Sequence, residues 1–235
     1  MANQIYQYSL VNALMSGVSD SGITVAKLIE KGNQGLGTFV RMDGELLLLD
    51  GQVYQLQAEG KIRIADLRDQ IPYAAATHFV PQITLTVQLK DKTSIDDVLE
   101  KYNNHAGNLF MSYRIEGKFK NLKCRTVKGQ EYDGQPLSEL GKNQFVANYE
   151  DIEGTIVGFR SPEAWQGFFV AGEHMHFIDR EKKVGGHVLE LSTGEGEVQM
   201  GVATVNNVHI ELPTSDRFNT AKMVTDNIGL KVVEG

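Results

Sequence analysis

The chain of 235 residues contains only one cysteine, Cys124, so it makes no internal disulfide and no use of an oxidising compartment. Positive charge is also scarce: 23 lysines and arginines face 30 aspartates and glutamates, for a formal net charge of -7. No basic cluster of five or more residues occurs, which argues against a nucleic-acid partner, because such partners need concentrated positive charge.

Long apolar runs are missing as well. No stretch approaches the ~18 consecutive apolar residues that a membrane span needs. The N-terminal residues lack the basic stretch and apolar core of a signal peptide. We therefore expect a cytoplasmic protein that binds neither membrane nor nucleic acid. Hydrophobic residues make up 41% and charged residues 23%, so the length and composition fit one large or two small globular domains.

The first half of the chain changes its periodicity. Leu10 and Leu14, then Val25 and Leu28, recur at helical spacing, so the first thirty residues are predicted to be helical. Residues 37–66 instead place Asp-Gly and Glu-Gly pairs between short apolar runs. These pairs favour tight hairpin turns, and they predict a meander of short antiparallel strands.

Strands and helices alternate in the rest of the sequence. Residues 81–89 predict a strand, and residues 94–105 a helix that is N-capped by Ser94. Residues 108–127 predict strands with a turn at Glu116-Gly117. The remaining expectations are a connection between two halves at 129–144, strands within 154–160, 167–178, 187–192, 197–205 and 208–213, and a short helix within 215–223.

Three of the six histidines lie in residues 172–191, "GEHMHFIDREKKVGGHVLEL". His174 and His176 are two residues apart, so on a strand they share one face. His187 opens the next strand, behind a Gly-Gly pair that permits a close turn. If the strands pair antiparallel with His176 opposite His187, all three rings share one face, with opposed β-carbons ~5 Å apart.

Three imidazoles in this arrangement predict a metal site. Zinc suits them, with iron, copper or nickel as alternatives, and three protein ligands leave a position open for water or substrate, as in catalytic sites. The competing interpretation is a group of hydrogen-bonded core histidines without metal. The third histidine behind the Gly-Gly pair favours the metal site. No function is assigned to His78, His105 and His209, which are scattered along the sequence.

Two further motifs are interpreted as structural rather than functional. "GLGTF", residues 35–39, lacks the lysine and the length of a phosphate-binding loop, so it predicts a strand start where glycine allows close backbone approach. A strand end is also predicted, followed by a helix with Ser161 as its cap and Pro162 at its first position. Arg160, beside them, is predicted to form an ion pair rather than to contact substrate.

The blocks "GLGTFVRMDGELLLLDGQVYQ" and "GFRSPEAWQGFFVAGEHMHFIDREKKVGGHVLEL", together with "IPYAAATHF" and "KCRTV", resemble the alpha-acetolactate decarboxylases over nearly the whole chain. The resemblance implies an α/β fold with two domains: a mixed β-sheet domain in residues 1–130, and a mainly antiparallel, barrel-like β domain in residues 131–235 whose tail reaches the active site. It also implies a zinc-dependent homodimer that converts (S)-2-acetolactate to (R)-acetoin and CO2, on the route to 2,3-butanediol.

The resemblance also transfers roles to single residues. It implies that Zn2+ is held by the three histidines, that Thr38 binds substrate near the metal, and that the proton donor is Glu45 or Glu234. The chemistry is consistent with this set, because decarboxylation of a β-keto acid needs a metal and a guanidinium to stabilise negative charge, and an acid to protonate carbon. The implied site residues are catalytic Glu45, Arg125 and Glu234, substrate-binding Thr38, and metal-binding His174, His176 and His187.

Two other functions compete with this one. A cupin-like metal-dependent dioxygenase or isomerase is suggested by the His-x-His pair followed by Glu181, but His209 lacks the proline and glycine that flank the later cupin histidine. The other alternative is a non-catalytic β-sheet binding module with a buried histidine cluster. Without the resemblance, Glu45 is interpreted as a surface charge and Arg125 as part of an ion pair.

Overall fold

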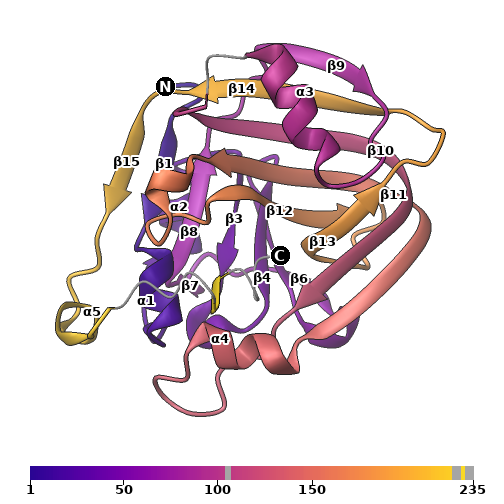
Figure 1. Ribbon diagram of the computed structural model, residues 1–235. Coiled ribbons are helices and arrows are strands. Elements are labelled where there is room, and N and C mark those ends of the chain that lie inside the picture. Colours follow the sequence, from indigo (N-terminus) through magenta and orange to yellow (C-terminus); the bar gives the residue numbers. More distant parts are fainter. Residues whose placement is uncertain (104–106, 224–228, 231–235) are drawn as a thin grey trace.

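Two large β-sheets dominate the chain. The computed structural model describes residues 1–103, 107–223 and 229–230, and in these residues the strands form a seven-stranded, a six-stranded and a two-stranded sheet. Figure 1 shows the strands of the six-stranded sheet running across those of the seven-stranded sheet, with α3 over the outer end of the former. Among the described helices, none has the length and apolar character of a membrane span.

The seven-stranded first sheet has the order β15-β1-β8-β3-β4-β5-β6. It is mixed, because β15 pairs parallel to β1 while the other neighbours pair antiparallel. Its strands are β1 (Ile5–Tyr8), β3 (Gln34–Thr38), β4 (Glu45–Leu49), β5 (Gln52–Leu56), β6 (Ile62–Ile64), β8 (Tyr73–Thr77) and β15 (Val208–Glu211).

The six-stranded second sheet has the order β11-β12-β13-β10-β14-β9, and β11 also pairs with β10. All of its pairings are antiparallel, and β10 and β11 stay paired from Met111–Arg160 to Thr126–Phe145. Its strands are β9 (Ile83–Val87), β10 (Phe110–Thr126), β11 (Phe145–Ser161), β12 (Gly172–Asp179), β13 (Gly185–Ser192) and β14 (Val198–Val205). The small third sheet consists of β2 (Ile23–Thr24) and β7 (Gln70–Ile71).

Helices are short and lie between the strands. The longest described helix, α3, is amphipathic and buries Ile95 and Leu99. The α-helices are α1 (Val11–Met15), α2 (Val25–Ile29), α3 (Ser94–Tyr102), α4 (Leu137–Leu140) and α5 (Asp216–Thr220); the 3-10 helices are η1 (Val40–Met42), η2 (Ala58–Gly60), η3 (Gly141–Asn143) and η4 (Glu163–Trp165).

Apolar side chains between the two large sheets hold them together. Leu36 and Leu47 of the first sheet belong to one buried cluster with Val157 and Ile178 of the second. A separate cluster lies under α3 and includes Tyr113 of β10. The space between the sheets is therefore a dry core, and polar groups that face it stand out as candidates for function.

The expected fold class is confirmed as a strand-rich mixture of α and β elements. The two-domain organisation and the barrel-like second domain stay predictions. Sheet membership does not change at residue 130, because β9 and β10 precede that position and lie in the second sheet, while β15 follows it and joins the first.

Most of the expected strands and helices are present, including the meander of residues 37–66. The prediction that the first thirty residues are helical is wrong in part, because residues 5–8 form β1 between β8 and β15. The turn expected at Glu116-Gly117 is also wrong. β10 continues through Gly117, which pairs with Gly154 of β11, so pairing to the neighbouring strand overrides the local preference of Glu-Gly for a turn.

Two expected helix starts need correction. Thr93, not Ser94, is the N-cap of α3; the Ser94 hydroxyl instead accepts hydrogen bonds from the backbone N–H groups of Lys90 and Asp91. After Ser161 the chain forms only the 3-10 turn η4, with Pro162 as its N-cap rather than its first residue.

Candidate metal and active site

The three histidines of the second sheet form one cluster. His176 of β12 is the direct partner of His187 of β13, and His174 lies two residues along β12. The ring centroids are 5.1 to 5.5 Å apart, and the possible ligand atoms all lie within 4.8 Å of one another. The strand pairing predicted from the spacing is confirmed. Zinc binding by these residues stays a prediction.

Neighbouring groups orient one of these rings. His176 Nδ1 lies 2.7 Å from the carbonyl oxygen of Leu46 on β4. The Nδ1–H group therefore donates to this carbonyl, which leaves the lone pair of Nε2 directed toward the cluster. A hydrogen bond from the second ring nitrogen to a carbonyl is the usual support of a metal-binding histidine.

Burial keeps His174 and His187 uncharged. Burial, and to a lesser extent the positive charge of Arg125, lower the pKa of His174 from 6.5 to about 3. The pKa of His187 is also held well below its ordinary value, first by burial and then by Arg125 and the two other histidines. Neutral imidazoles are the form that binds metal, so the site is prepared for a cation at neutral pH.

A buried ion pair lies beside the histidines. Arg125 Nη1 is 2.8 Å from Glu45 Oε1, and both side chains are almost fully buried. The second oxygen of Glu45 is 3.6 Å from His176 Nε2. Arg125 is itself the strand partner of His187. The ion pair therefore bridges β4 of the first sheet and β10 of the second at the histidine cluster.

Thr38 lies next to Glu45. The two residues are direct partners on β3 and β4, and Tyr73 on β8 is the partner of Thr38 on the other side. The Thr38 hydroxyl donates to the carbonyl of Gly44 at 2.7 Å. This row of three side chains crosses the end of the first sheet, on the side that faces the second sheet.

A pocket opens onto this row. Polar groups of Thr38, Glu45, Arg125 and His174 line it together with an apolar wall. The wall consists of Val11, Leu14, Gly37, Met42, Tyr73, Val127, Leu137 and Val170. A small pocket with a few convergent polar groups and an apolar wall suits a short substrate that carries charge at one end and methyl groups at the other.

Not all expected residues can be placed. Glu234 lies outside the described residues. Glu181, the cupin-like alternative ligand, is exposed and pairs with Lys183, whereas the histidines are buried. Arg160 makes the expected ion pairs, at 3.5 Å to Asp96 and 3.7 Å to Glu173.

The sequence did not predict the apolar wall of the pocket, which includes Tyr73. These residues come from six separate parts of the chain, so no local pattern gathers them. The expectation for "GLGTF" is confirmed, since residues 34–38 form β3. A β-carbon on Gly37 would lie only 2.2 Å from the carbonyl oxygen of Tyr73, so glycine lets the two strands approach at this point.

The chain matches known proteins along most of its length. Residues 5–225 match the family model described as alpha-acetolactate decarboxylase. An alpha-acetolactate decarboxylase of Klebsiella aerogenes is 37% identical, with 95% of this chain and 85% of that protein covered. One from Lactococcus lactis subsp. cremoris is 36% identical over 91% of this chain and 89% of its own length.

Solved structures agree with these matches. The crystal structure of alpha-acetolactate decarboxylase from Bacillus subtilis strain 168 has a TM-score of 0.93 to this chain at 31% identity, and 99% of both chains is covered. A Staphylococcus aureus protein described as similar to alpha-acetolactate decarboxylase has a TM-score of 0.89 at 30% identity, covering 98% of each chain. Sequence and structure together place the chain in the alpha-acetolactate decarboxylase family.

Proposed function

We propose that the chain decarboxylates (S)-2-acetolactate to (R)-acetoin at a zinc ion held by His174, His176 and His187. As a member of its family the chain is a carboxy-lyase that acts on acetolactate and forms acetoin. The observation that carries the metal assignment is the cluster of three buried histidines, whose ligand atoms lie within 4.8 Å of one another beside the pocket. Three imidazoles suit zinc and leave room for substrate.

The reaction makes clear demands on the pocket. Breaking the bond between the carboxylate and the central carbon releases CO2 and leaves an electron pair, which moves onto the ketone oxygen and produces an enediolate. A divalent metal at the histidines supplies a Lewis acid that stabilises this negative charge. Protonation of one face of the enediolate carbon then fixes the configuration of acetoin.

Arg125 and Thr38 are proposed to hold the substrate. The guanidinium of Arg125 is buried and fixed by Glu45, so its planar donor group is oriented in advance for the substrate anion. The hydroxyl proton of Thr38 is directed to the Gly44 carbonyl. Toward the pocket Thr38 therefore offers an acceptor, which suits the hydroxyl group of acetolactate.

Glu45 and Glu234 are proposed to share the proton transfer. Glu45 lines the pocket, and its two oxygens face Arg125 and His176. Its position supports a role as the proton donor or as the closest partner of the donor. Glu234 is proposed to approach from the C-terminal tail, on the strength of the family resemblance alone.

The observations favour this function over the cupin-like alternative. A cupin-like site requires a carboxylate such as Glu181 among the ligands, but the described group of possible ligands consists of the three histidines. The homodimer and the cytoplasmic location stay predictions, and sedimentation and cell fractionation test them.

The deciding experiment supplies racemic acetolactate to the purified protein before and after chelation. We expect consumption of the (S)-substrate, (R)-acetoin on a chiral column, and one zinc per chain by elemental analysis. Chelation should abolish acetoin formation, and added Zn2+ should restore it. Full activity in protein shown to be free of metal would contradict the zinc assignment.

A further inference from the structure

The turn that leads into Glu45 has an unfavourable backbone. Between β3 and β4, Arg41 has φ 62° and Met42 has φ 53°, and Gly44 follows with φ 79°. Residues other than glycine rarely adopt this left-handed region, and they keep it only where surrounding contacts hold the chain. Glu45, the first residue of β4, comes directly after this turn, so whatever holds the turn also fixes the start of β4.

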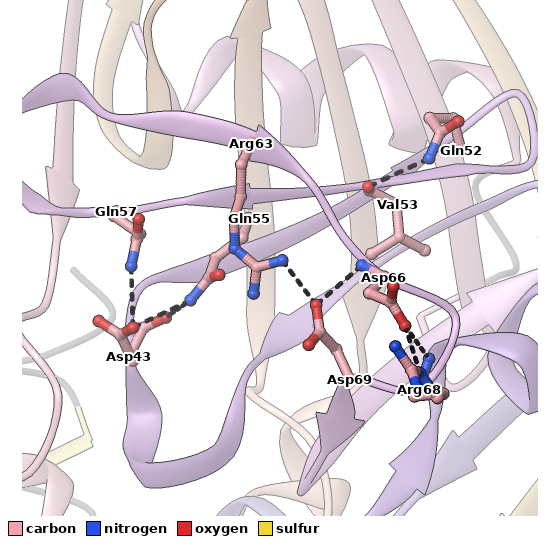
Figure 2. Close-up of polar contacts among 9 residues, drawn as sticks. All are labelled: Asp43, Gln52, Val53, Gln55, Gln57, Arg63, Asp66, Arg68 and Asp69. Carbon is pink, nitrogen blue, oxygen red and sulfur yellow. Dashed lines mark hydrogen bonds and ion pairs between the residues drawn. The ribbon is translucent and has the colours of Figure 1, made fainter.

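Two glutamines hold the turn from one side. The amide of Gln55 donates to the backbone oxygen of Asp43 at 2.6 Å and to its carboxylate at 3.1 Å. The amide of Gln57 donates to the same carboxylate oxygen at 2.9 Å. Figure 2 shows both amides converging on Asp43. Hydrogen bonds to an ionised carboxylate are stronger than those between neutral groups.

Gln55 and Gln57 lie on the face of the first sheet that is opposite the Glu45 side chain. Gln55 is the strand partner of Leu46, and it is buried on the same face as Leu46 and Val53. Glu45 precedes Leu46, so its side chain points to the opposite face, toward His176. Gln55 and Gln57 therefore act on the turn without lining the substrate pocket.

The segment after β10 supports the other side of the turn. The backbone N–H of Gln130 donates to the Arg41 carbonyl at 2.6 Å, and the Arg41 guanidinium donates to the Gln130 carbonyl at 2.7 Å. A β-carbon on Gly129 would lie 3.1 Å from that of Asp43. Since β10 also carries Arg125, the turn is fixed to the strand that supplies the partner of Glu45.

We propose that Asp43, Gln55 and Gln57 are positioning residues that set the Glu45 carboxylate for proton transfer in the decarboxylation. The inference rests on the proposed function of Glu45. Acid catalysis demands close geometry, and a shift of about 1 Å at a reacting group lowers a rate by about 100-fold. Without the glutamine amides, the strained turn relaxes and the carboxylate leaves its position between Arg125 and His176.

The test uses the full-length zinc enzyme with Gln55→Leu, Gln57→Leu and Asp43→Ala. Gln52→Leu is the matched control: it lies on the same strand, and among the described residues its amide donates to the Val53 carbonyl at 3.4 Å, away from the turn. For each protein, zinc content, kcat, KM and the enantiomeric purity of acetoin are measured well below the unfolding temperature. Gln57 is only half-buried, so Gln57→Leu is expected to fold even if Gln55→Leu does not. Its kcat then tests the positioning role of the turn.

We expect each turn variant to retain zinc and KM, to lose about 10- to 100-fold in kcat, and to give acetoin of lower enantiomeric purity. Asp43→Ala combined with Gln57→Leu should lower kcat no further than Asp43→Ala alone, because both changes remove the same contact. Unchanged kcat per zinc and unchanged purity in all three variants would overturn the inference. Failure of the wild-type and Gln52→Leu enzymes to form acetoin would instead refute the proposed function.

Discussion

Two substitutions of Arg125 distinguish the effect of its positive charge from the effect of its planar donor geometry. Arg125→Lys keeps a positive charge beside Glu45 but removes the planar guanidinium, whereas Arg125→Met removes both. In the structure the guanidinium contacts Glu45 at 2.8 Å, lines the pocket, and has a side chain only 2% exposed. We therefore expect the two variants to differ in stability but to have similarly low activity.

The stability ranking follows from burial. Arg125→Met deprives a buried carboxylate of its ion-pair partner, which costs about 3–5 kcal/mol. For a chain of this size that corresponds to a fall of roughly 6–20 °C in the unfolding temperature. Arg125→Lys should lose much less, because the ammonium still compensates the charge of Glu45.

The activity ranking follows from donor geometry. Loss of one oriented donor to a developing anion lowers turnover by about 10²-fold or more. Both variants should therefore have similarly low kcat, although only Arg125→Met is strongly destabilised. The assay combines acetoin formation per zinc with thermal unfolding. Near wild-type turnover in Arg125→Lys would show that Arg125 is only structural.

A double substitution controls the stability argument. Glu45→Gln together with Arg125→Met removes both charges, so the double variant should be more stable than Arg125→Met alone. If the double variant is less stable by the sum of the single losses, the two side chains are not coupled, and the assigned cost of burial is wrong.

Three other predictions concern the metal and the proton. His176→Ala should lose both zinc and activity while the circular dichroism stays that of a folded β-protein; full metal occupancy would refute the ligand assignment. In the metal-free protein, His174 and His187 stay neutral when folded, while unfolded histidines gain protons below about pH 6.5. Stability should therefore fall as the pH drops from 6.5 toward 3, by about 1.4 kcal/mol per pH unit for each histidine, and acid titration of chelated protein measures it. Glu45→Gln and Glu234→Gln, checked for intact zinc, identify the donor: its loss should abolish activity or erode the enantiomeric purity of acetoin, and an unchanged Glu45→Gln enzyme excludes that residue.

The histidine cluster was predictable because its geometry is local. Strand periodicity puts His174 and His176 on one face, and a short turn brings His187 opposite His176. The same periodicity does not predict the contact between Glu45 and Arg125. That contact depends on how one sheet crosses the other, and only the resemblance singled out these residues in the sequence.

Local preferences also failed where tertiary pairing overrode them. Glu116-Gly117 has the composition of a turn, but β10 is held there by β11 on one side and β14 on the other. The sequence did not predict strand β1, because its residues precede a helical segment and contain no turn residues. Asp43-Gly44 predicts a turn before Glu45, but no glycine indicates the positive φ angles at Arg41 and Met42.

The parallel pairing of β1 with β15 has a consequence for synthesis on the ribosome. β8, β3 and β4 can assemble with β1 once residue 77 has emerged, but Ile5 must wait for its partner Val208. At ~5–20 residues per second this wait lasts on the order of 10 s. During that time the nascent chain exposes an unpaired strand edge, the kind of surface that recruits other chains. The Tyr6 hydroxyl, which donates to Glu211 at 2.8 Å, helps to close that edge, so damage to this contact should appear first as lower yield during expression rather than as slower catalysis.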